Sequence, residues 1–114
     1  MEAGLGTLLR LESGQADVVL AVADPTAKAI DVTRRVVEVG SGRAEVIVVA
    51  NRVRGERDLE AVRAAAGSHE LAAVPEDAAV TRAERDGRAP IDVDPGAAAV
   101  LAVGRLARRL ARRR

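Results

Sequence analysis

The polar residues best placed to bind a ligand follow directly after three apolar runs of the chain. They are Asp24-Pro25-Thr26, Asn51-Arg52-Val53-Arg54 and Pro75-Glu76-Asp77. In a parallel sheet the carboxyl ends of the strands lie on one rim, and ligands bind beyond that rim. We therefore expect these three segments to form one site, provided that the three apolar runs are neighbouring parallel strands.

Asn51 carries the most specific chemistry of these residues. Its carboxamide offers one donor group and one acceptor group, so it can bind an edge that presents the complementary pair. The alternative is a structural role, because asparagine also closes strands by bonding to its own backbone. For Pro75-Glu76-Asp77 the structural role is a strand stop followed by a helix cap, which is compatible with ligand binding.

The composition excludes several classes of chemistry. The chain has no cysteine, which excludes disulfides, thiolate catalysis and cysteine-ligated metal. Its one histidine, His69, cannot form a metal site without several nearby carboxylates, so we assign no metal and no catalytic residue. The chain also has no aromatic residue on which the bases of a single-stranded nucleic acid could stack. Lys28, the only lysine, falls inside an expected helix, and the phosphate-binding pattern G-x-x-x-x-G-K-[ST] does not occur.

Alternating strand and helix patterns position the candidate residues. Apolar runs rich in β-branched residues predict strands over 17–23, 44–50 and 70–74, buried on both faces. Helical spacing with glycine stops predicts helices over 3–12, 25–39, 57–66, 78–86 and from about 95 to the C-terminus, with 88–93 as a loop. Asp24-Pro25 and Asp94-Pro95 are expected to start helices, and Asp77 to cap the helix over 78–86.

This order of elements predicts a single α/β domain over residues 1–114. Strands that alternate with helices imply three layers, with a short parallel sheet of about three strands between the helices. The formal net charge of +1 gives no global field that would attract an acidic partner. No signal-peptide pattern and no apolar run of about 20 residues occurs, so we expect a cytoplasmic protein.

In their order and spacing, these motifs resemble the carboxyl-terminal half of the MinD/ParA family of P-loop ATPases. The resemblance covers nearly all of the chain and is carried by Met1-Glu2-Ala3-Gly4, Ile47-Val48-Val49-Ala50-Asn51-Arg52-Val53, Val74-Pro75-Glu76-Asp77 and Gly87-Arg88-Ala89-Pro90. The most similar subgroup is the accessory ATPases that assist nickel insertion into carbon monoxide dehydrogenase. That subgroup carries Glu-His where this chain has Gly6-Thr7, so we assign no nickel-related role.

The resemblance implies a partial P-loop fold, ATP as the ligand and ATP-dependent dimerisation. In the family, the asparagine that closes the strand similar to 44–50 hydrogen-bonds the adenine edge, and the Pro-x-Asp loop packs over the base. Carried over to this sequence, the adenine-binding residues are Asn51 and Arg52, together with Pro75, Glu76 and Asp77.

The phosphate-binding half of that fold has no counterpart in this sequence. The resemblance begins one residue after the position of the Walker B aspartate, and the Walker A motif does not occur, so the Mg²⁺ site is incomplete on this chain. We expect weak or absent ATP binding and no hydrolysis by this chain alone, because the missing groups supply most of a rate acceleration of roughly 10⁶-fold or more.

The missing half also predicts an open sheet edge at the strand over 17–23. We expect a phosphate-binding half, a partner chain or a second copy to cover that edge, and the sequence to be a fragment of a longer gene product. The alternative is a non-enzymatic interaction module that pairs through the same edge. A flavodoxin-like regulator is disfavoured, because the first strand is not followed by clustered acidic residues.

The C-terminus is rich in arginine and carries an apolar stripe. Val103, Leu106, Ala107 and Leu110 follow helical spacing, with arginines on the opposite side. We interpret this segment as a final helix packed on the sheet, its cations favoured by the helix dipole. Membrane contact and nucleic-acid contact are the weaker alternatives. Against bilayer insertion, the stripe has only two leucines and no aromatic anchor.

Overall fold

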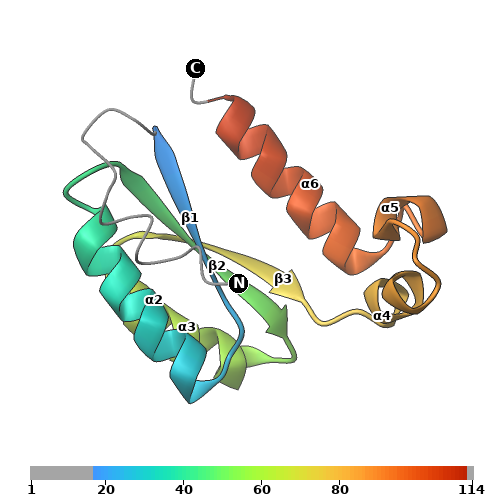
Figure 1. Ribbon diagram of the computed structural model, residues 1–114, viewed down its shortest axis with the longest axis horizontal. Coiled ribbons are helices and arrows are strands. Elements are labelled where there is room, and N and C mark those ends of the chain that lie inside the picture. The colour runs from blue at the N-terminus through green and yellow to red at the C-terminus, as the bar shows by residue number, and fades with distance from the viewer. Residues whose placement is uncertain (1–16, 113–114) are drawn as a thin grey trace.

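The central element of the fold is β2 (Glu45–Val53), a strand whose first half is buried on both faces. β1 (Val18–Ala23) and β3 (Glu70–Pro75) pair with it on either side, and both pairs are parallel. The computed structural model describes residues 17–112, and it confirms the predicted α/β architecture with a three-stranded parallel sheet (Figure 1). The carboxyl ends of the three strands therefore lie on one rim.

The helices follow the strands in sequence, and two of them end at predicted glycine stops. They are α2 (Ala27–Gly40), α3 (Glu56–Ala66), α4 (Ala78–Arg85), α5 (Pro90–Val93) and α6 (Ala98–Ala111). Gly67 follows α3 at φ 60° and Gly87 follows α4 at φ 66°. Glycine adopts this left-handed backbone without steric cost, which explains the abrupt ends of both helices.

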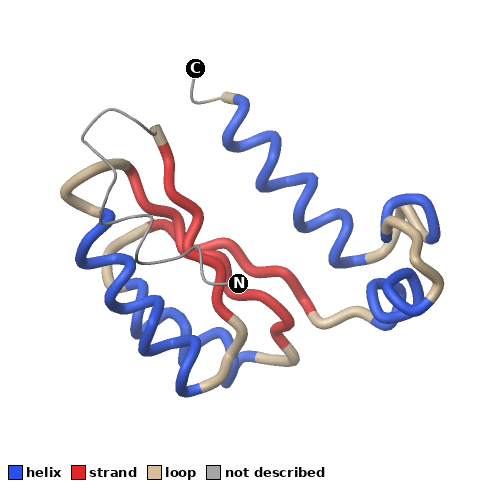
Figure 2. Tube along the Cα trace, in the orientation of Figure 1, coloured by secondary structure: helices blue, strands red, loops and turns tan. Residues whose placement is uncertain are grey.

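The two faces of the sheet are covered by different helices, as Figure 2 shows. On one face, alternate residues of β1 and β2 pack against α2 and α3, around the fully buried Val62. On the other face, Ile47 and Val49 of β2 and the inward residues of β3 pack against Ala99, Ala102 and Leu106 of α6. This alternation follows from the two-residue repeat of a strand.

The sequence placed the starts of two helices too early. Asp24-Pro25 does not start α2, since the cap is Thr26, whose Oγ1 accepts a hydrogen bond from the Ala29 amide. Likewise α6 begins at Ala98 and not at Asp94-Pro95, because the Asp94 carboxylate accepts a hydrogen bond from the Gly96 amide and forms a turn. Aspartate side chains stabilise caps and tight turns by the same kind of bond, so the sequence pattern does not separate the two.

Two further boundaries were wrong. β2 does not stop at residue 50 but continues to Val53 through an irregularity in its pairing with β3. The expected loop over 88–93 contains the short helix α5, which has Pro90 at its first position. Proline suits that position because its missing N–H would have no partner there. The expected helix over 3–12, with Met1-Glu2-Ala3-Gly4 and Gly6-Thr7, lies outside the described residues.

Burial on both faces holds for β2 but not for β1. Leu20 and Val22 on β1 remain 41% and 59% exposed, because among the described helices α6 packs chiefly against β3 on that face. The predicted stripe of α6 is also wrong in part: Leu106 is buried, whereas Val103 is 52% exposed. No helix within residues 17–112 is long and apolar enough to cross a membrane.

Candidate functional site

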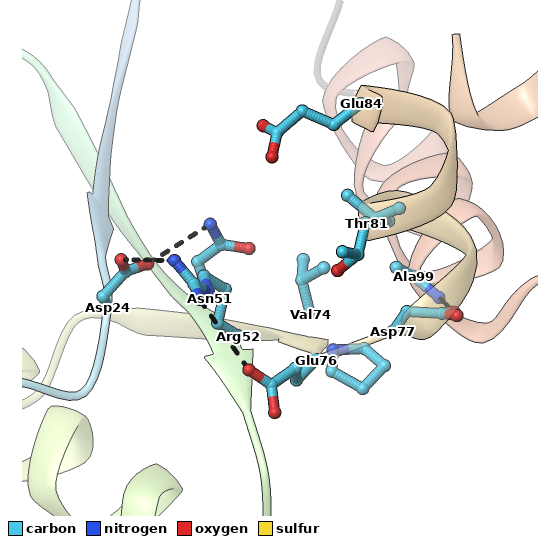
Figure 3. A pocket seen from close by; sticks show the side chains of 11 residues that line it. Asp24, Asn51, Arg52, Val74, Glu76, Asp77, Thr81, Glu84 and Ala99 are labelled. Carbon is cyan, nitrogen blue, oxygen red and sulfur yellow. Dashed lines mark hydrogen bonds and ion pairs between the residues drawn. The ribbon is translucent and has the colours of Figure 1, made fainter. Parts of the chain in front are cut away.

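A cleft of about 450 Å³ lies at the carboxyl rim of the sheet. The ends of the three strands, α4 and the start of α6 line it (Figure 3). All five residues predicted from the sequence contribute to the wall, namely Asn51, Arg52, Pro75, Glu76 and Asp77. The parallel register explains this convergence, because it places Val53 of β2 beside Pro75 of β3.

Asn51 and Asp24 are held together across the ends of β2 and β1. The Asn51 Nδ2 donates a hydrogen bond to the Asp24 Oδ1 at 3.4 Å, and both residues are half-buried. In Figure 3 the carboxamide nitrogen faces Asp24, whereas the carboxamide oxygen points into the cleft toward the side of Thr81. The carboxylate fixes this orientation, because the flipped amide would place its oxygen against a negative charge. The acceptor of Asn51 is therefore the group presented to a ligand.

Arg52 adopts a backbone conformation that is unusual for its residue type. Its φ is 58°, and it lies where the pairing of β2 with β3 becomes irregular. The turn of the backbone directs the guanidinium between two carboxylates, 3.7 Å from the Asp24 Oδ2 and 3.8 Å from the Glu76 Oε1. Because the Arg52 side chain is 64% exposed, these ion pairs contribute little to stability, and their effect is to place a cation at the mouth of the cleft.

The Glu76 carboxylate that pairs with Arg52 also pairs with Arg54, farther along the rim. Arg54 Nε lies 3.9 Å from the Glu76 Oε2 and 3.9 Å from the Asp58 Oδ2. The Arg54 amide also donates a 2.9 Å hydrogen bond to Asp58, in the first turn of α3. Glu76 is thus shared between two arginines, and the loop between β2 and α3 is tied to the end of β3.

Asp77 joins two helices at the far wall of the cleft. Its Oδ1 accepts a hydrogen bond from the Ala79 amide in α4, and its Oδ2 accepts one from the Ala99 amide in α6, both at 2.9 Å. These amides, that of Ala99 first, lower the pKa of Asp77 below its ordinary value of 3.8. The predicted cap of α4 is confirmed, and the same carboxylate caps α6, whose own N-cap residue offers no side-chain acceptor.

An apolar groove of about 480 Å³ adjoins the cleft. The two cavities share Asn51, Val74, Val80 and Ala99, and the groove continues past them between α5 and α6. A polar carboxamide thus lies at the boundary between a polar cavity and an apolar one.

Four contributors to the cleft were not identified from the sequence, namely Val80, Thr81, Glu84 and Ala99. Thr81 and Glu84 lie four and seven residues after Asp77, so the helical repeat carries a signal that places them on the same side of α4. Ala99 gave no such signal, because its position depends on how α6 packs on the sheet. Asp24 was expected at the rim and as a helix start; it lines the cleft, but its side chain bonds Asn51 and the cap of α2 is Thr26.

The lining suits recognition of an uncharged polar ring. Val74, Pro75 and Val80 supply apolar surface, Asn51 supplies an acceptor, and Arg52 is the only cation among the lining residues. Within residues 17–112, no group of three or more histidine, aspartate and glutamate side chains could hold a metal ion. The chain matches no family model and no curated protein.

Proposed function

We propose that this chain is the base-binding half of an adenine-nucleotide site. The observation that carries the proposal is the convergence of Asn51 and Pro75-Glu76-Asp77, from two neighbouring strands, on one cleft at the carboxyl rim. Open parallel sheets bind their ligands beyond this rim. The resemblance to the MinD/ParA ATPases, and within them to the nickel-insertion accessory ATPases, assigns the same residues to the base.

The orientation of Asn51 supports adenine over guanine as the base. The carboxamide oxygen faces the cleft and can accept a hydrogen bond from an exocyclic amine such as the N6 amine of adenine. In the pose that offers the N6 amine of adenine, guanine presents O6, which is itself an acceptor and would meet the Asn51 oxygen without a proton between them. Such an unmade bond costs roughly 1–3 kcal/mol, about a factor of 5 to 150 in affinity.

The charges of the cleft support binding of the base without its phosphates. Four carboxylates, those of Asp24, Glu76, Asp77 and Glu84, line the cleft against a single arginine, so a polyphosphate would be repelled there. In the proposal, another polypeptide segment supplies the phosphate-binding and Mg²⁺-binding groups. This chain alone therefore binds nucleotide weakly and does not hydrolyse it.

NMR titration at millimolar nucleotide tests this function on the full chain. ADP should shift the amide resonances of residues at the rim, including Asn51 and Asp77, and GDP should shift them less at equal concentration. Asn51→Ala should weaken ADP binding by about threefold to tenfold, which is the worth of one hydrogen bond. Arg57→Ala on the exposed side of α3 is the matched control and should leave the titration unchanged.

Two results would contradict the proposal. One is a set of ADP-induced shifts that is identical for the wild type and Asn51→Ala, since the carboxamide would then play no part. The other is phosphate release by the purified chain, measured with malachite green, that Asn51→Ala abolishes, because the chain alone would then carry a complete site.

A second candidate function is a non-enzymatic module that associates through the edge of its sheet. It is favoured by β1, which pairs with one strand of the described sheet and exposes Leu20 and Val22 on one face. Exposed apolar edge strands pair readily with other chains. A homodimer of the wild type at micromolar concentration, measured by light scattering without nucleotide and lost in Val22→Lys, would favour this function. A monomeric wild type would argue against self-association.

A further inference from the structure

The apolar groove has one wall on α6 and the other on α5. Val100, Val103, Gly104 and Ala107 form the α6 wall, and Pro90 and Ile91 form the opposite wall. Val103 is 52% exposed and Ile91 is 60% exposed, so two large apolar side chains face the groove without cover from the described residues. Exposed apolar surface of this kind, gathered in a concave site, is typical of a binding surface.

The groove lies on a different side of α6 from the face that packs on the sheet. The sheet-facing side consists of Ala99, Ala102 and Leu106, all three buried, and of these only Ala99 also borders the groove. The helical repeat places Val103 and Ala107 beside the sheet-facing side and not within it, so the groove wall is a neighbouring side of α6. Filling the groove therefore requires no displacement of α6 from the sheet.

The side of α6 that borders the groove on the solvent side is basic. Arg105, Arg108 and Arg112 are exposed, and α6 contains no acidic residue. Arg108 lies directly at the groove, with its Nη1 3.6 Å from the position that a Cβ on Gly104 would occupy. A partner seated in the groove would therefore meet positive charge along the outer edge of α6.

We propose that this groove binds an amphipathic helix of a partner protein, with apolar residues that enter the groove and acidic residues that face the arginines of α6. Helices of this kind bind apolar grooves through residues at i, i+3, i+4 and i+7. The charge of α6 selects an acidic flank and speeds association. This inference goes beyond nucleotide binding and does not rest on it.

The shape of the surface favours a protein helix over a lipid bilayer. A helix that lies in a membrane interface presents its most apolar face to the lipid. The face of α6 that carries Leu106 is already buried against β3, and Val100, Val103 and Ala107 line a hollow. A hollow can bind a convex partner such as a helix, whereas a bilayer does not offer a convex surface of that size.

Fluorescence anisotropy with synthetic peptides tests the inference on the full chain. The probe is a labelled 16-residue helix-forming peptide with leucine at i, i+3, i+4 and i+7 and glutamate on the flanks. A matched peptide carries lysine in place of every glutamate. We expect the acidic peptide to bind and the basic one not to bind, and the affinity of the acidic one to fall as salt is raised.

Variants inside and outside the groove identify the surface that binds the peptide. Val103→Asp, in the groove, should weaken binding at least tenfold. Val32→Asp is the matched control, since Val32 is 42% exposed on α2 and does not line the groove. It should change the affinity less than twofold. Circular dichroism should show both variants folded, because both positions are exposed.

Arg108→Glu tests the charge and should weaken binding of the acidic peptide while improving that of the basic one. The inference is overturned by equal affinities of Val103→Asp and Val32→Asp, or by equal binding of the two peptides to the wild type. It is also overturned by co-sedimentation with phosphatidylglycerol vesicles in the absence of any peptide binding, which would assign the surface to lipid.

Discussion

The Asp77 carboxylate accepts a hydrogen bond from the Ala99 amide, 22 residues further along the chain. Asp77 ends the connection from β3, and Ala99 lies in the first turn of α6. The bond attaches the helix that covers one face of the sheet to the rim where the candidate site lies.

Asp77→Ala should destabilise α4 and α6 together. Both helices lose an acceptor for an amide of the first turn, so the melting temperature should fall by roughly 5 °C or more. Hydrogen exchange should speed up at the amides of Ala79 and Ala99. Asp86→Ala, at the other end of α4, is the control and should melt within about 1 °C of the wild type. Equal melting of the two variants would show that the carboxylate of Asp77 does not hold the helices.

The same carboxylate predicts a defined dependence of stability on pH. The amides of Ala99 and Ala79 lower the pKa of Asp77 in the folded state, so the folded protein binds a proton there less tightly than the unfolded chain. This contribution is present above the ordinary value of 3.8 and is lost as the pH falls through the lower pKa of the folded state. Urea denaturation from pH 7 to pH 3 should therefore show the difference between the wild type and Asp77→Asn shrinking toward the acid end. A difference that grows on acidification would reverse the sign and reject this explanation.

Replacements at Arg52 should reveal the cost of its left-handed backbone. Glycine adopts this conformation freely, whereas valine is hindered by its branched Cβ, so Arg52→Gly should be about 1 kcal/mol or more stable than Arg52→Val. At Arg54, whose φ is not positive, the order should reverse, with the valine variant more stable than the glycine variant. Chemical denaturation of the four variants measures both differences. The same order at both positions would show that backbone conformation at Arg52 does not decide the result.

Two isoleucines allow a buried position to be compared with an exposed one. Ile47 is fully buried in the sheet, and its replacement by alanine should cost about 2–5 kcal/mol through lost burial and a residual cavity. Ile91 is 60% exposed in α5, and its replacement by alanine should change stability by less than about 0.5 kcal/mol. Because the core has no aromatic residue, the first variant should approach the limit of folding. Similar denaturation midpoints for the two variants would contradict the packing described here.

The site residues that could be predicted are those whose positions follow from the local sequence pattern. The apolar runs and the polar residues after them placed Asn51, Arg52 and Pro75-Glu76-Asp77 at strand ends, and all of them line the cleft. The starts of α2 and α6 were not predictable, because aspartate before proline or glycine stabilises a turn as readily as a helix cap. The left-handed turn at Arg52 was also missed, since arginine gives no local sign of it.

By itself, the sequence determined the three strands, their parallel direction and the rim on which Asn51 and Pro75 meet, because periodicity and strand–helix alternation are properties of neighbouring residues. Only the tertiary structure decided which way the Asn51 carboxamide points, that Asp77 caps two helices, and that α6 leaves Leu20, Val22 and one groove uncovered. Each of these depends on contacts between residues far apart in the chain. Such contacts depend on how the helices pack over a whole face of the sheet, and no local sequence pattern encodes that packing.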